Sequence, residues 1–121
     1  MTDSKYVSIE SRNEVLLVTA LCTEMDEERT RALQDEASTA AATAPSQPVV
    51  LDLSRVTFVP SLSLAALVTL QRTCKTRGQR LVLAGVQQNV RGALTVTHLD
   101  RLFQIFDTPE DAISHLRGES L

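Results

Sequence analysis

Hydrophobic and polar residues alternate near the start of the chain and then give way to continuous apolar runs. Val7 and Ile9 alternate with polar neighbours, as in a half-buried strand, and a longer apolar run covers 15–22. The polar residues between the two segments include Asn13, which tolerates left-handed turn geometry. The two segments therefore predict a β-hairpin.

A helix is predicted to follow the hairpin. Asp26 is a good helix cap, and Glu27 and Glu28 place negative charge in the first turn, where the helix dipole favours it. The residues expected on the buried face of this helix are Thr30, Leu33, Ala37 and Ala40. The segment 38–48 is rich in Ala, Thr, Ser and Pro. We expect its start to be the fraying end of the helix and its remainder to be a loop.

Two short apolar runs, 49–53 and 80–86, flank a segment with the composition of a buried helix, 62–77. Continuous apolar runs are typical of strands that are covered on both faces. The predicted helix ends on basic residues and is followed by Gly78, as is usual at a helix C-terminus. Strand, helix and strand in this order predict a right-handed crossover between adjacent parallel strands.

The last third of the chain predicts two more helices around a short edge strand. Helical spacing of apolar residues begins at Val90, and the apolar segment 99–106 is expected to be a loop with a brief edge strand. Thr108 and Pro109 are typical of the start of a final helix. We expect one α/β domain over 1–121, with a mixed, mostly parallel sheet of four to five strands and about four helices. Residues 1–5 and 117–121 are expected to be flexible.

Composition and charge narrow the classes of function. The chain has 121 residues, 43% apolar content, a net charge of −3 and 3% aromatic residues, so it fits one domain with an ordinary core and no nucleic-acid footprint. The N-terminus lacks a signal pattern and no apolar stretch is long enough to span a bilayer, so we expect a cytoplasmic protein without membrane insertion. Cys22 and Cys74 lie in apolar runs and are expected to be buried thiols.

The sequence contains no recognisable catalytic pattern. His98 and His115 are not paired with a nucleophile motif, and the four glycines form no phosphate-binding loop. The acids at 24, 26, 27 and 28 are interpreted as a solvated helix start. We therefore expect no enzymatic activity, no cofactor and no metal site.

Ser61 stands where the apolar helix is expected to begin. Its hydroxyl could cap the helix by accepting a backbone N–H, or it could accept a phosphate on an exposed turn, and both roles could hold together. A helix N-terminus stabilises added negative charge through its dipole and its unbonded N–H groups.

The chain resembles the STAS family of bacterial anti-sigma factor antagonists over most of its length, from about Val15 to Leu116. Residues 23–26 resemble the Gly-Glu-Leu-Asp motif of the family, and Pro60-Ser61-Leu62-Ser63 replace its Asp-Ser-Ser-Gly phosphorylation turn, with Ser61 at the acceptor position. The other matching segments are 49–54, 56–59, 78–86 and 99–108.

The resemblance implies a phosphorylation switch. The unmodified domain would bind a kinase-type anti-sigma factor, and phosphorylation of Ser61 would break that contact. The residues then expected to bind the partner are Asp26, Val59, Pro60, Ser61, Leu62 and Ser63. The alternative is a non-enzymatic accessory subunit bound to the ATPase of a lipid-handling ABC transporter, with an unphosphorylated turn.

Overall fold

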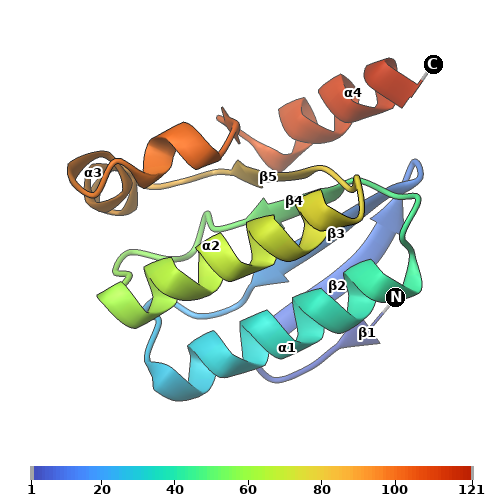
Figure 1. Cartoon of the computed structure of the whole chain (residues 1–121). Coiled ribbons are helices and arrows are strands. Elements are labelled where there is room, and N and C mark those ends of the chain that lie inside the picture. Colours follow the sequence, from blue (N-terminus) through green and yellow to red (C-terminus); the bar gives the residue numbers. More distant parts are fainter. Residues whose placement is uncertain (1, 121) are drawn as a thin grey trace.

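Six strands form one mixed sheet in which the spatial order of the strands is their order along the chain (Figure 1). The structure is a computed structural model and describes residues 2–120. The strands are β1 (Thr2–Asp3), β2 (Val7–Arg12), β3 (Val15–Ala20), β4 (Val49–Asp52), β5 (Leu81–Ala84) and β6 (Ile105–Phe106). The first two pairings are antiparallel and the next three are parallel, so the predicted mixed sheet is confirmed. The sheet has one strand more than the four to five predicted, because β1 lies in the N-terminal segment that was expected to be flexible.

The predicted hairpin is present as β2 and β3. Arg12 is paired with Val15, so only Asn13 and Glu14 form the loop. Both have positive φ, at 56° and 64°. A two-residue loop with both residues in the left-handed region matches the right-handed twist of the flanking strands, which explains the tight connection.

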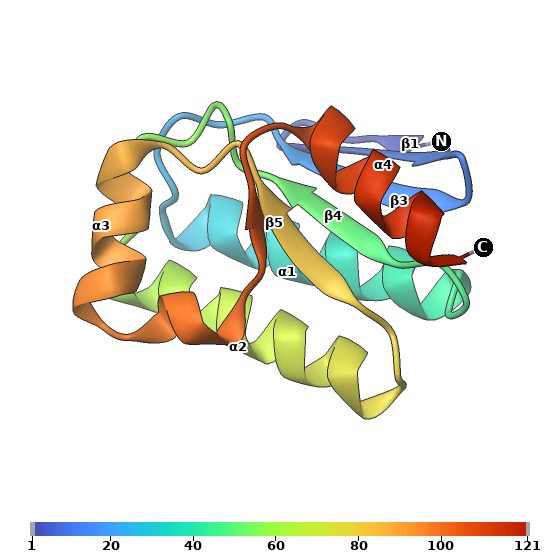
Figure 2. The same ribbon diagram turned by 90° about the horizontal axis from the view of Figure 1, so that it is seen from above.

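Helices cover both faces of the sheet (Figures 1 and 2). The helices are α1 (Glu27–Thr43), α2 (Ser61–Thr76), α3 (Gln88–Val96), the 3-10 helix η1 (Leu99–Leu102) and α4 (Pro109–Ser120). One face packs against α1 and α2, and the other packs against α4. The central strands are therefore covered on both sides, as the continuous apolar runs predict.

The predicted crossover is confirmed. Strand β4 pairs in parallel with β5, from Val49 opposite Leu81 to Asp52 opposite Ala84, and α2 connects them. Every residue of both strands is buried. Val49 and Leu51 belong to the core beneath α1 and α2, whereas Val50 packs in the cluster beneath α4.

Helix α1 continues to Thr43, so the prediction that it frays from Ser38 is wrong. Its buried face contains the expected Thr30, Leu33 and Ala37 and continues to Ala41, whereas Ala40, which was also expected there, is only partly buried. The end of the helix is bound by a residue far away in the sequence. The buried Gln79 side chain donates from Nε2 to the carbonyl oxygens of Ala41 (3.1 Å), Ala44 (3.1 Å) and Gln47 (2.8 Å). The Ala44 carbonyl also accepts the N–H of Gln47 at 3.0 Å, whereas the Ala41 carbonyl lies in the last turn of α1, where the helix itself supplies no N–H donor.

Candidate functional site

Two loops are joined at the carboxyl ends of β3 and β4. The backbone N–H of Thr57 donates to the carbonyl of Thr23 at 2.7 Å, and the N–H of Met25 donates to the carbonyl of Phe58 at 3.1 Å. Glu24 and Phe58 form a parallel bridge. Because neighbouring parallel strands end at the same edge of a sheet, these bonds bring the beginnings of α1 and α2 to one end of the molecule.

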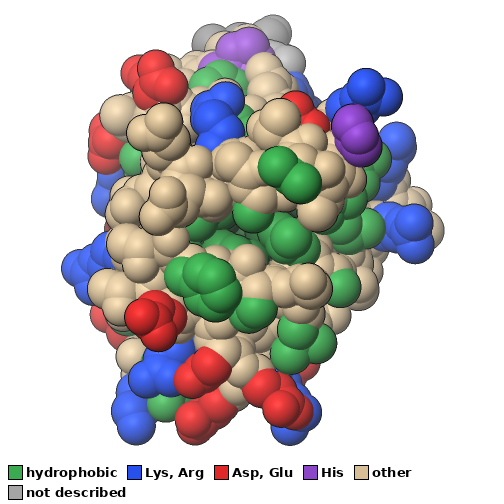
Figure 3. All heavy atoms as spheres, turned by 90° about the vertical axis from the view of Figure 1, so that its left-hand side faces the viewer, with side chains coloured by type: hydrophobic (Ala, Val, Ile, Leu, Met, Phe, Trp, Pro, Cys, Tyr) green, Lys and Arg blue, Asp and Glu red, His purple; other side chains and the backbone are tan. Residues whose placement is uncertain are grey.

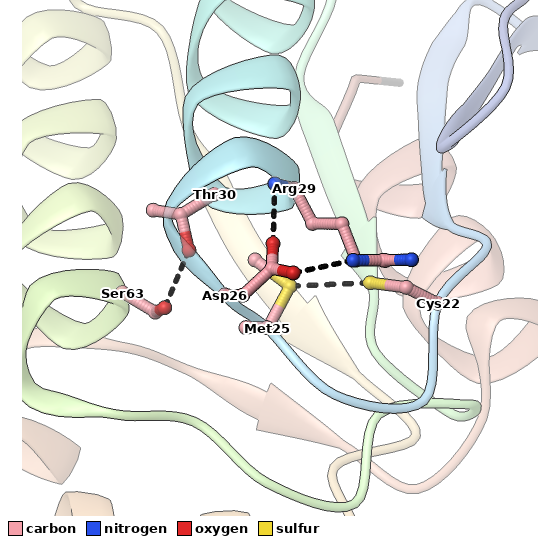
Figure 4. A network of polar contacts seen from close by, with 6 residues as sticks. All are labelled: Cys22, Met25, Asp26, Arg29, Thr30 and Ser63. Atoms are coloured by element: carbon pink, nitrogen blue, oxygen red, sulfur yellow. Dashed lines mark hydrogen bonds and ion pairs between the residues drawn. The ribbon is translucent and has the colours of Figure 1, made fainter.

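The beginning of α1 is capped by a side chain. Asp26 is the N-cap, and its Oδ1 accepts the backbone N–H of Arg29 at 2.8 Å (Figure 4). Its Oδ2 contacts the Arg29 guanidinium, which also lies 4.8 Å from the centre of the Tyr6 ring. The hydrogen bond from the Arg29 backbone, together with the guanidinium charge, lowers the pKa of Asp26. The helix start predicted at Asp26 is confirmed, and the Asp26 carboxylate is bonded to both the backbone and the side chain of Arg29.

The beginning of α2 has no side-chain cap. Pro60 is the N-cap, with φ of −73°, and its carbonyl accepts the N–H groups of Ser63 (2.9 Å) and Leu64 (3.1 Å). Ser61 is the first residue of the helix and is exposed. The hypothesis that its hydroxyl caps the helix is therefore wrong. A capping Ser61 would require the helix to begin at Leu62, but it begins one residue earlier, at Ser61, and Pro60 occupies the N-cap position. Among the described residues, the Ser61 hydroxyl has no hydrogen-bond partner.

The residues expected to bind a partner divide into exposed and buried groups. Asp26, Ser61 and Leu62 are exposed, and Pro60 is half-buried. Val59 and Ser63 are buried, with only 8% and 1% of their surface exposed, so neither side chain is part of the exposed surface of the turn. The residue after Phe58 turns inward, and Val59 joins the core beneath α1 and α2.

Ser63 points toward α1 instead of toward solvent. Its Oγ lies 2.5 Å from Oγ1 of Thr30, which is also buried, and either hydroxyl could be the donor (Figure 4). The position where the family turn has glycine is therefore part of the interface between α1 and α2.

Two exposed hydrophobic side chains lie beside the Ser61 turn, and the sequence did not single them out as a pair. Phe58 and Leu62 are 58% and 53% exposed, and they flank the Ser61 turn in the chain. Beside Phe58 lies a hollow of about 410 Å³ whose lining residues are Thr23, Glu24, Met25, Asp26, Arg29, Phe58 and Pro60. Figure 3, which faces the end of the molecule that carries the start of α2, shows hydrophobic side chains around a central hollow with charged residues toward the rim. Such an arrangement is typical of a surface that binds another protein.

The two cysteines lie in the interior of the domain. Cys22 and Cys74 are both free and buried, as predicted, and burial raises the pKa of each thiol, so the unreactive protonated form is favoured. The Cys22 thiol lies 3.4 Å from the Met25 sulfur. Between residues 2 and 120 no group of three or more His, Cys, Asp or Glu side chains is arranged to hold a metal ion.

None of the helices in the described part of the chain combines the length and the apolar character needed to cross a membrane.

Comparison with protein families gives a match over most of the chain. A family model described as "Mlab, STAS domain" matches residues 10–105. A protein of Thermotoga neapolitana named "Putative anti-sigma factor antagonist TM1081 homolog" is 30% identical over 70 residues, which cover 58% of this chain and 62% of that protein. The chain thus spans about three fifths of the length of the curated relatives it matches, 62% and 61%.

Solved structures share the fold. The anti-sigma-factor antagonist (STAS) domain protein from Planctomyces limnophilus superimposes with a TM-score of 0.81 at 20% identity, over 91% of this chain and 96% of that chain. The Bacillus cell fate determinant SpoIIAA in its phosphorylated form gives a TM-score of 0.70 at 18% identity, over 90% and 97% of the two chains. At these identities the likeness concerns the fold.

Proposed function

The chain belongs to the STAS family, and we propose that it is an anti-sigma factor antagonist that binds its partner through the turn at the beginning of α2. In this proposal the chain is a cytoplasmic binding module that has no catalytic activity of its own and needs no cofactor. The observation that carries the proposal is an exposed, unbonded Ser61 hydroxyl next to the exposed side chain of Leu62.

The chemistry of this turn suits a switch. Ser61 is small and neutral and has apolar neighbours, so a partner can cover the turn without burying a charge. Phosphorylation would add roughly −1.5 to −2 charge units. The N–H groups of the first turn of α2 would stabilise the phosphate in the unbound domain. Burying the same charge against a partner would be costly, so the modified domain would dissociate.

The departures from the family turn are compatible with this role. Ser63, which replaces the family glycine, points inward and adds no side chain to the outer surface. Pro60, which replaces the family acid, forms the helix N-cap with its backbone carbonyl. Ser61 and Leu62 are the exposed residues of the turn, so a kinase could reach the Ser61 hydroxyl. This accessibility supports a kinase-type anti-sigma factor as the partner.

The test is capture of the partner from native lysate with the tagged chain. We expect an anti-sigma factor with serine kinase activity to be retained by wild type and by Ser61→Ala and to be lost by Ser61→Asp. The matched control is Ser114→Asp, which adds the same charge at an exposed position of α4, on the other face of the sheet. Incubation of the captured kinase with ATP should phosphorylate wild type and leave Ser61→Ala unmodified.

The second candidate is the accessory subunit of a lipid-handling transporter, and the absence of the family acid and glycine from 60–63 favours it. Its signature in the same experiment is capture of a transporter ATPase, with Ser61→Asp binding as well as wild type. That result would contradict the proposed switch.

A further inference from the structure

One buried hydrogen bond joins the beginnings of α1 and α2. Thr30 lies in the first turn of α1 and Ser63 in the first turn of α2, and their hydroxyl oxygens are 2.5 Å apart. The two residues are only 3% and 1% exposed. Among the described residues this is the one side-chain hydrogen bond between the two helices, and Leu33, Leu64 and Leu67 from the same helices belong to the apolar core.

We propose that the Thr30–Ser63 hydroxyl pair is a positioning device that fixes the first turn of α2, and with it Ser61, relative to the Asp26 end of α1. The inference rests on the proposed function, because it concerns how the Ser61 turn is presented to the anti-sigma factor. Thr30 and Ser63 are positioning residues, since both are too deeply buried to contact a partner.

The need for such a device follows from the way α2 begins. Its N-cap is Pro60, with no side-chain hydrogen bond, so no cap of its own fixes the orientation of the first turn. Leu64 and Leu67 pack on the core close by, but apolar contact has little directional preference. A hydrogen bond depends steeply on distance and angle, and a fully satisfied buried polar pair specifies one arrangement. The hydroxyl of Ser63, two residues from Ser61, supplies this directional contact.

The pair permits an experiment that separates positioning from stability. Thr30→Val or Ser63→Ala alone leaves the other hydroxyl buried without its partner, which is destabilising, whereas removing both is nearly neutral. The double variant should therefore unfold at a denaturant midpoint closer to that of wild type than either single variant does. A purely structural role predicts that its affinity for the partner returns as well. A positioning role predicts that the affinity stays low, because the directional contact is still missing.

The affinities are measured by calorimetric titration of each variant against the anti-sigma factor captured with the wild-type chain. We expect Kd to rise about five- to tenfold in each single variant, as for the loss of one hydrogen bond, and to remain raised in the double variant. Thr30→Ser keeps a hydroxyl and should retain the wild-type Kd. The matched control is Thr69→Val on α2, an exposed threonine whose hydroxyl donates to the Ala65 carbonyl, and its Kd should not change.

Amide chemical shifts give a second readout that does not need the partner. The Ser61 and Leu62 signals should move in Thr30→Val, Ser63→Ala and the double variant, and they should stay in place in Thr69→Val. A folded double variant with wild-type Kd and unshifted Ser61 and Leu62 signals would overturn this inference alone. Failure to capture any anti-sigma factor would instead overturn the proposed function on which it rests.

Discussion

The beginnings of α1 and α2 lie at the same end of the molecule but are built in opposite ways. Helix α1 starts with a capping carboxylate, Asp26, and carries Glu27 and Glu28 in its first turn. Helix α2 starts with Pro60, without a side-chain cap and without an acid in its first turn. Both helices are of similar length, with 17 and 16 residues, so the contrast lies in their first turns.

The difference indicates where the domain can accept a change of charge. The start of α1 already holds the negative charge that a helix dipole favours, so a further anion there would meet repulsion from three carboxylates. The start of α2 leaves its dipole uncompensated, and its first-turn N–H groups are not used by any side chain. A phosphate on Ser61 would be favourable at that end. The start of α1 therefore already carries negative charge, whereas the start of α2 can accept it.

The largest effect on the free energy of unfolding is expected in the middle of α2. Because this helix has no side-chain cap at its start, its stability must come from packing of its buried residues on the core. Leu67 is 2% exposed in the core, and Leu67→Ala should lower the free energy of unfolding by about 2–5 kcal/mol. Leu62→Ala is the matched control in the first turn of the same helix. It should change the free energy of unfolding by less than about 0.5 kcal/mol, since the Leu62 side chain is mostly exposed. Equal losses in urea denaturation would show that the beginning of α2 is as firmly packed as its middle.

The second largest loss of stability is expected at the C-terminal end of α1, where the Gln79 side chain binds the last carbonyl groups. Gln79→Leu removes the donor for three carbonyl groups while keeping a side chain of similar size. The expected loss is about 1–3 kcal/mol, the cost of leaving buried polar groups unpaired. Urea denaturation checks this value, and hydrogen exchange should show faster opening of the last turn of α1. Unchanged stability would mean that water replaces the amide without loss.

Gln79 also illustrates what the sequence could not predict. The order of elements, the crossover and the Asp26 cap depend on local patterns such as apolar runs, Gly78 after a helix and acids at a helix start. The three acceptors of Gln79 lie 32–38 residues away in sequence, and the partner of Ser63 lies 33 residues away. No local pattern encodes such contacts. For the same reason the continuation of α1 to Thr43 was missed, because the support for its end comes from Gln79.

The site was predictable in its position but not in the direction of its side chains. The turn 60–63 was identified from its place before an apolar helix, and the structure puts Ser61 and Leu62 on the surface. Whether a residue near a helix start faces outward depends on where the helix begins to within one residue. Because the N-cap is Pro60 and not Ser61, each residue of the first turn occupies a different helical position from the one expected, and Ser63 faces the interior. Phe58 could have been found as an aromatic residue in the short segment between the apolar run 49–53 and the turn 60–63.

A smaller, pH-dependent change in stability is expected when Asp26, the N-cap of α1, is replaced. The folded-state pKa of Asp26 is lowered, so its carboxylate stabilises the fold at pH values above its unfolded pKa of about 3.9. This contribution is lost as the pH falls through the folded pKa. Asp26→Asn should therefore lower the thermal midpoint at pH 7, and the difference from wild type should shrink below about pH 4. A difference that stays constant from pH 7 to pH 3 would show that the charge of Asp26 is not involved.

The smallest effect is expected at Ser61 itself, and it is the sharpest test of the contrast between the two helix starts. A capping serine would cost about 0.5–2 kcal/mol when replaced by alanine. Ser61 instead follows the N-cap and its hydroxyl is unbonded, so Ser61→Ala should change the free energy of unfolding by less than about 0.5 kcal/mol. Ser61→Asp should raise it by about 0.3–1 kcal/mol at low ionic strength, because the new carboxylate meets the uncompensated dipole of α2. Added salt should reduce this gain, since the position is exposed and screening acts there. Thermal melts of wild type and both variants at low and high salt measure these changes. A destabilised Ser61→Asp would mean that the start of α2 does not favour negative charge, and the electrostatic basis for a phosphate at this turn would be lost even if a partner still binds there.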